Sequence, residues 1–201
     1  MKPQSQDRIT DGLEFSDIAT YLQTKYGLYV DITEDDVGLA GEVAALQNGV
    51  LLVNVRMRTN NCRVFIVSHV FGHIVQYCES GRYVDLISNI SAATPPITLS
   101  PALRALQEEY ETEAFAIGLG LLKSVYDLTE DEEIQFQAFM RTDIDHYLTY
   151  LTSGQARSDC EYQELYSINL EAGRSQAFRS TAFMPPPLRI DPRMARDIYI
   201  V

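Results

Sequence analysis

The stretch that decides the fold is Ser68–Gln76, SHVFGHIVQ, because it holds two of the chain's three histidines inside an apolar run. His69 and His73 are four residues apart, and residues at that spacing lie on one face of an α-helix, about 5–6 Å from each other. Two imidazole nitrogens placed in this way can bind one metal ion at roughly 2.0–2.1 Å. The alternative is that both histidines are hydrogen-bonded residues of the core.

The surroundings of this pair are apolar on nearly all sides, as RVFIVSHVFGHIVQY (residues 63–77) shows. A buried imidazole is costly unless a metal or hydrogen bonds compensate it. We expect the helix that carries it to run from about Cys62 to Glu79 and to stop at Gly81.

A small sheet is predicted before this helix. Residues 15–26 have the apolar spacing of an amphipathic helix, with Ser16 as N-cap. LYVDI (residues 28–32) reads as a strand, and two β-prone runs flank Asn48-Gly49, a strong hairpin pattern. We therefore expect a small antiparallel sheet that ends near Met57.

Two long helices are predicted after it. SNISAATPPIT (residues 88–98) reads as a loop. Ser100 is an N-cap before a proline, so the next helix should extend to about Tyr126. Thr129 and Glu132 form the capping box of a helix that ends near residue 152.

The fold class predicted from this order is α+β, a small antiparallel sheet followed by a helical bundle. We expect a flexible leader over residues 1–14, a metal-binding domain over 15–152 and a C-terminal extension over 153–201 packed on that domain. DIYIV (residues 197–201) could add an edge strand.

A third metal ligand is sought on the helix SPALRALQEEYETEAFAIGLGLL (residues 100–122). Its inward stripe can be traced as Leu103, Leu106, Tyr110, Glu113 and Ile117. Glu109 lies four residues before Glu113 on the same side, whereas Glu108 and Glu111 are expected on the opposite, solvated face. A carboxylate on an apolar stripe is costly to bury unless a cation meets it. Two histidines and one glutamate would give the three-ligand arrangement of catalytic zinc.

Two motifs together resemble the ImmA/IrrE-type metallopeptidases, gluzincin-like proteins of bacteria. They are RVFIVSHVFGH (residues 63–73) and EYETEAFAIGLGLL (residues 109–122), and the resemblance covers roughly residues 15–125. It implies a zincin-like fold, with His69, His73 and Glu109 as ligands of a divalent metal, zinc above all. It also implies that Glu113 orients a ligand imidazole from behind.

Val70 departs from this family, which has at that position the glutamate that takes a proton from metal-bound water. Loss of a positioned general base costs about 10²–10⁴-fold in rate. A metal alone can still lower the pKa of its water to near 7. The sequence therefore favours a divergent or weak hydrolase, or a pseudopeptidase that only binds.

His146, the third histidine, lies in TDIDHYLTY (residues 142–150) beside Asp143 and Asp145. It is either a fourth ligand or acid/base group that faces the site, or a helix-face histidine beside solvated aspartates. Tyr77 and Tyr110 are possible proton donors, and the sequence does not choose between them.

Net charge excludes two classes of partner. At −12, the chain lacks the clustered positive charge that nucleic acid and anionic membranes require, so neither is expected as a partner. No signal peptide or transmembrane run is visible, and three cysteines without a paired motif favour a reducing cytoplasm. A protein or peptide remains as substrate or partner.

Three functions stay open on these residues. The first is the zincin-like metalloprotein. The second is a non-haem iron oxidoreductase, because two histidines and one carboxylate also form its facial triad. The third is a metal-free interaction module with packed histidines.

Overall fold

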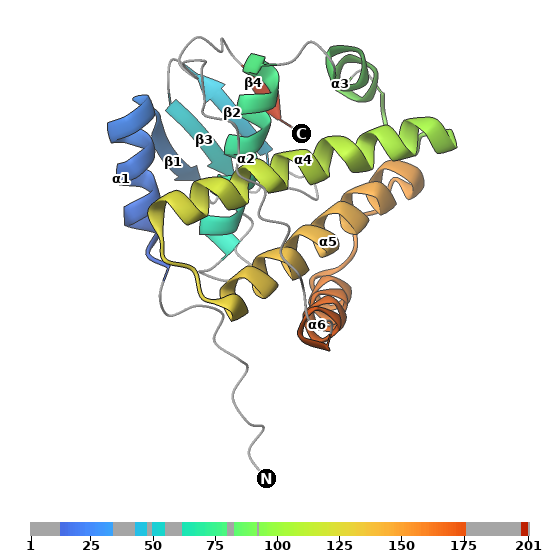
Figure 1. Cartoon of the computed structure of the whole chain (residues 1–201). Coiled ribbons are helices and arrows are strands. Elements are labelled where there is room, and N and C mark those ends of the chain that lie inside the picture. The colour runs from blue at the N-terminus through green and yellow to red at the C-terminus, as the bar shows by residue number, and fades with distance from the viewer. Residues whose placement is uncertain are drawn as a thin grey trace.

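The computed structural model describes residues 13–33, 43–47, 50–54, 62–79, 83–91, 93–175 and 198–200 (Figure 1). Its elements, in chain order, are α1 (Phe15–Tyr26), β1 (Tyr29–Thr33), β2 (Val43–Gln47), β3 (Val50–Asn54), α2 (Cys62–Glu79), α3 (Val84–Ser91), α4 (Pro101–Val125), α5 (Glu130–Ser153), α6 (Asp159–Ser175) and β4 (Ile198–Ile200). Most of the described residues are helical, and a helical bundle, as predicted, makes up the larger part of the molecule.

The strands form one mixed sheet in the order β1-β3-β2-β4. β2 and β3 are antiparallel, with Gln47 opposite Val50, as the hairpin pattern predicts; the Asn48-Gly49 turn lies outside the described residues. β1 is parallel to β3, so the prediction of a wholly antiparallel sheet is wrong. The reason is the order of the strands: β3 lies between β1 and β2. Therefore β1 pairs with β3, which runs parallel to it, and not with β2. β4 pairs with β2 at the edge, where DIYIV was expected.

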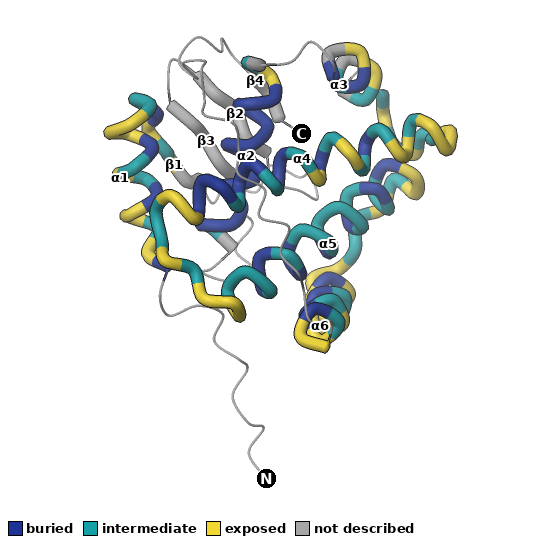
Figure 2. Tube along the Cα trace, in the orientation of Figure 1, coloured by how far each residue is buried: buried dark blue, intermediate teal, exposed yellow. Residues whose placement is uncertain are grey.

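Helix α2 lies at the centre of the molecule and is buried along nearly its whole length (Figure 2). Its aromatic side chains join the helices around it: the Phe65 ring is 5.1 Å from Phe136 and 5.7 Å from Phe139, both on α5. Phe115 of α4 meets the same two rings at 5.8 Å. Because α2 is apolar all round, it can be stable only in such a position, with neighbours on every side.

The helix boundaries follow the capping residues. Ser100 Oγ accepts from the backbone N–H of Leu103 and begins α4, and Thr129 with Glu132 forms the capping box that begins α5, both as predicted. The N-cap of α1 is Glu14 and not Ser16, which lies inside the first turn. The backbone oxygen of Glu14 accepts from the Asp17 N–H and the Tyr126 hydroxyl, and these bonds place the N-cap two residues earlier than predicted.

Two helices were not predicted. α3 covers the first residues of the stretch that was expected to be a loop, and α6 lies where the helix patterns weaken. A second capping box begins α6: Ser158 Oγ accepts from the Glu161 N–H, and the Glu161 carboxylate accepts from the Ser158 N–H. α6 packs on α5 (Figure 1).

Residues 1–12 of the predicted leader lie outside the described part of the chain, and the domain limits at 15–152 and 153–201 stay predictions. Among the described residues, none of the helices combines the length and the apolar character needed to cross a membrane.

Candidate metal centre

Small residues bring α2 and α4 into close contact. A Cβ added to Gly72 would lie 2.1 Å from the carbonyl oxygen of Ala114, and one added to Gly118 would lie 2.7 Å from that of Ser68. These contacts decide which face of α4 meets α2. Glu111 precedes Ala114 by three residues and therefore lies on this same face.

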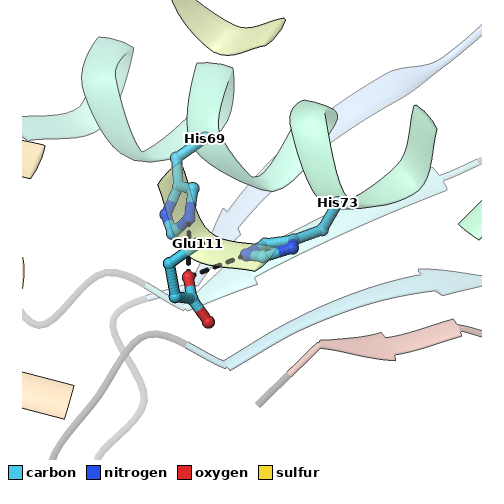
Figure 3. Close-up of side chains that lie close together, drawn as sticks. All are labelled: His69, His73 and Glu111. Carbon is cyan, nitrogen blue, oxygen red and sulfur yellow. Dashed lines mark hydrogen bonds and ion pairs between the residues drawn. The ribbon is translucent and has the colours of Figure 1, made fainter. Parts of the chain in front are cut away.

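Glu111 meets both histidines of α2 at this contact (Figure 3). Its Oε2 atom is 3.1 Å from Nε2 of His69 and 3.2 Å from Nε2 of His73. The three residues are nearly sealed from solvent, with exposures of 6%, 3% and 6% for His69, His73 and Glu111. One carboxylate oxygen thus faces two imidazole nitrogens in the interior.

These distances fit a shared cation. In a tetrahedral site with bonds of roughly 2.0–2.1 Å, neighbouring ligand atoms lie about 3.3 Å apart. The two N···O distances are close to that value, and the three ligand atoms all lie within 4.8 Å of one another. The group can therefore hold a metal ion with little movement of its side chains.

Polar partners orient the ligand side chains from behind. Gln107 Nε2 donates to Glu111 Oε1 at 2.8 Å, and His73 Nδ1 donates to Gln76 Oε1 at 3.0 Å. The Nδ1 atom of His69 has no hydrogen-bond partner in the described structure, although Asp143 Oδ2 is 3.8 Å away on α5. Metal-binding imidazoles usually donate a hydrogen bond from the nitrogen that does not bind the metal, as His73 does to Gln76.

Aromatic rings hold the imidazoles in place. The His69 ring stacks on Phe115 with centroids 3.7 Å apart and planes 8° from parallel. The His73 ring lies 4.5 Å from that of Tyr110. Phe115 and Tyr110 both belong to α4. The helix that supplies the carboxylate therefore also holds the two imidazole rings of α2 in place.

Burial and charge set the ionisation of the group. Burial raises the pKa of Glu111, but the charge of His73 and the hydrogen bonds from both imidazoles outweigh it and hold that pKa at about 2. Burial and the charge of His73 lower the pKa of His69 to about 4. The hydrogen bond to Glu111 acts in the opposite direction and does not offset them. At neutral pH the carboxylate is therefore ionised and His69 is neutral, which are the forms that bind a metal.

The structure brings together His69 and His73, as predicted, but places Glu111 between them and not Glu109. Glu109 is exposed and lines a pocket on the outer side of α4, so the prediction that Glu111 is the solvated one is wrong. The predicted stripe followed the large apolar side chains. Of that stripe only Ile117 is buried, whereas the buried positions of α4 also include Gln107, Glu111, Ala114, Gly118 and Leu121. The close contact with α2 is made at Ala114 and Gly118.

Glu113, predicted to orient a ligand imidazole, accepts a hydrogen bond from Gln76 Nε2 at 2.9 Å. It therefore reaches His73 through Gln76, which the sequence reasoning missed, as it missed Gln107. Both glutamines occupy helix positions that repeat with the ligands: Gln76 follows His73 by three residues and Gln107 precedes Glu111 by four. Glutamines at these spacings, on a helix face that is otherwise apolar, could have indicated that they contact the ligands.

None of the other candidates is one of the three clustered residues. His146 is buried on α5 with its ring 5.4 Å from Tyr162, so it is not a surface histidine, and it is not among the three clustered ligands. Tyr77 is 48% exposed, whereas Tyr110 contacts His73. Val70 is 3% exposed and belongs to the apolar core.

No protein-family model, curated protein or solved structure matches this chain. The resemblance to the ImmA/IrrE-type family therefore rests on the two motifs alone and stays a prediction.

Proposed function

We propose that this chain is a zincin-like metalloprotein that binds one zinc ion through Nε2 of His69, Nε2 of His73 and Oε2 of Glu111. One observation carries the proposal: a single buried carboxylate oxygen lies 3.1 and 3.2 Å from both imidazole nitrogens. Buried charges in proteins are paired or bind metals, and two imidazoles with one carboxylate are a ligand set that zinc accepts.

We infer that the site binds its metal without the peptide hydrolysis of the family it resembles, or with only a weak remnant of it. Val70 supports this inference because its side chain offers no proton acceptor and belongs to the core. The near-complete burial of the three ligands supports it as well, since a peptide carbonyl needs an open position on the metal. We also propose that the protein is cytoplasmic.

The test is the metal content of the protein, purified without added metal and then titrated with zinc. We expect close to one equivalent of zinc per chain, and loss of that zinc in Glu111→Gln and in the double variant His69→Ala, His73→Ala. Glu109→Gln is the matched control, because it makes the same change two residues away on the exposed side of α4. Loss of zinc in Glu109→Gln with retention in Glu111→Gln would contradict the assignment.

The same measurement separates the two remaining functions. Iron in place of zinc would favour a non-haem iron oxidoreductase, whose chemistry needs no glutamate at position 70. Neither metal bound, and melting unaffected by chelator or by added zinc, would favour a metal-free interaction module.

A further inference from the structure

The side-chain amide of Gln76 has only one possible orientation. Its Nε2 atom lies 2.9 Å from the backbone oxygen of Tyr110 and 2.9 Å from Glu113 Oε2. A backbone carbonyl and a carboxylate both accept hydrogen bonds, so the NH₂ group of Gln76 must face them. Rotating the amide by 180° would place its oxygen against two other oxygens.

The oxygen of Gln76 therefore faces His73, 3.0 Å from Nδ1. An amide oxygen can only accept, so Nδ1 of His73 must carry a proton. A neutral imidazole has one N–H group, and its Nε2 atom then presents a lone pair. That lone pair points at Glu111 Oε2, 3.2 Å away, which is also an acceptor. Two acceptors face each other at this distance only when a cation lies between them: a proton on Nε2 in the metal-free protein, in which His73 is charged, or the metal in the loaded protein.

We propose that Gln76 is a positioning residue that holds His73 in its Nδ1–H tautomer and so makes Nε2 the metal-binding nitrogen. This inference rests on the proposed function and deepens it. Gln76 is itself held in place by Glu113 and α4, so the helix that supplies the carboxylate ligand also sets the tautomer of a ligand on the facing helix.

Gln107 acts on the carboxylate in a corresponding way. Its Nε2 atom donates to Glu111 Oε1 at 2.8 Å, and its side chain is 2% exposed. With Oε1 occupied, Oε2 is the oxygen that remains for the cation. The two buried glutamines thus select one donor atom on each of two ligands, and Glu111 binds through a single oxygen.

A merely structural role predicts a different result from the one expected here. If Gln76 only filled space, replacing it would change stability but not the protonation of His73. The decisive readout is therefore the nitrogen spectrum of the imidazoles in protein labelled with ¹⁵N-histidine, together with zinc affinity measured by competition with a chromophoric chelator.

The experiment compares the wild-type chain with Gln76→Leu and Gln135→Leu. Gln135 is the matched control, because it is also a buried glutamine, and its amide donates to Asp131 and not to Glu113 or the backbone of α4. In zinc-loaded wild-type protein we expect the His73 proton on Nδ1. In Gln76→Leu we expect that signal to shift or broaden and zinc affinity to fall 10–100-fold. Gln135→Leu should change neither.

Each of the other outcomes would overturn either the role given to Gln76 or the proposed function. A His73 with its proton on Nε2 in zinc-loaded wild-type protein overturns the inference without any variant, even if Gln76→Leu fails to fold. Normal zinc binding by the wild-type chain, with unchanged affinity and spectrum in Gln76→Leu, also overturns the inference and leaves the proposed function intact. Absence of zinc binding by the wild-type chain overturns the proposed function, and with it the role given to Gln76.

Discussion

The surroundings of Glu111 and His69 lower both pKa values and so keep the two side chains in their metal-binding forms well below neutral pH. The pKa of His69 is about 4 in the folded protein against an ordinary 6.5, and that of Glu111 is about 2 against 4.5. In each case the unfolded chain binds a proton at a pH where the folded chain does not. Stability therefore falls as the pH falls, first through the window of His69 and then through that of Glu111.

The first prediction concerns the metal-free protein. Between pH 6.5 and 4, protonation of His69 in the unfolded chain should lower the free energy of unfolding by an amount on the order of 3 kcal/mol. The Glu111 contribution is present above pH 4.5 and is lost as the pH falls toward 2. Urea unfolding of chelator-treated protein at several pH values measures both effects.

His69→Gln provides the control for this profile, since a glutamine at this position does not titrate. The variant should lose much of the slope between pH 6.5 and 4 and keep the fall below pH 4.5. A stability that is constant between pH 7 and 4.5 in the wild-type chain, or an unchanged slope in the variant, would contradict the assigned shifts.

The second prediction concerns Val70. Val70→Glu restores the sequence pattern of a zinc peptidase but places a carboxylate in the apolar core. We expect a loss of roughly 2–4 kcal/mol in stability and no gain in hydrolysis of a generic peptide. Val70→Gln, which has a similar shape without the charge, separates the effect of size from that of ionisation. A folded Val70→Glu protein with increased peptidase activity would show instead that the site is a degraded peptidase.

The sequence reveals the histidine pair but not its acid. His69 and His73 were recognisable because two imidazoles at helical spacing in an apolar run have few explanations. Glu109 and Glu111 differ by about 200° around the same helix, so a wrong choice of buried face exchanges them. That face is set by Ala114 and Gly118, whose small size matters only when the facing helix is known.

At the scale of elements, the site depends on how closely α2 and α4 pack. Contact between the two backbones is possible because Gly72 and Gly118 have no Cβ where they meet the backbone carbonyls of the facing helix. Any widening of this contact moves Glu111 away from both histidines, because the carboxylate and the imidazoles lie on different helices. Helix packing would thus set the affinity of the proposed site for its metal.

The third prediction follows from this contact. Gly72→Ala places a Cβ 2.1 Å from a backbone oxygen, which no side-chain rotation can relieve, so the helices must separate. We expect a loss of about 3 kcal/mol or more in stability and at least a tenfold loss of zinc affinity in the protein that still folds. Calorimetry and zinc competition measure the two effects.

Gly173→Ala is the control, because its new Cβ would meet only the Cγ2 atom of Ile134, 2.9 Å away at the end of a side chain. This variant should lose much less stability and keep its zinc affinity. Equal effects of the two substitutions would show that the close contact between α2 and α4 has no special importance.

The sequence predicts elements well where their ends carry local chemistry. Ser100 and the Thr129 capping box began their helices as expected, and the runs around Asn48-Gly49 paired as a hairpin. The parallel pairing of β1 with β3 was not predictable in this way, because it depends on which side of β3 the hairpin partner occupies. α6 was missed although its Ser158–Glu161 capping box is of the same kind as the one recognised.

At the scale of the whole molecule, the metal group lies where the main layers of the core meet. α2 contributes the two histidines and packs chiefly on α4, which contributes Glu111, while Phe65 of α2 reaches the aromatic residues of α5. A metal bound by this group would join α2 to α4 and so stabilise contacts throughout the core. Its effect should be visible in global unfolding and not only near the site.

The fourth prediction is that zinc raises the melting temperature of the whole chain in one cooperative transition. A ligand that binds only the folded state adds about 4 kcal/mol at a free concentration a thousand times its Kd. For a chain of 201 residues this corresponds to a shift of about 10 °C. Chelator should reverse the shift. Glu111→Gln should abolish it, and Glu109→Gln should retain it.

Magnesium at the same concentration should have little effect, because it prefers oxygen ligands and imidazole does not suit it. An equal shift with magnesium, or one that survives in Glu111→Gln, would mean that the cation binds elsewhere, at carboxylates on the acidic surface, and that the buried histidines do not hold it.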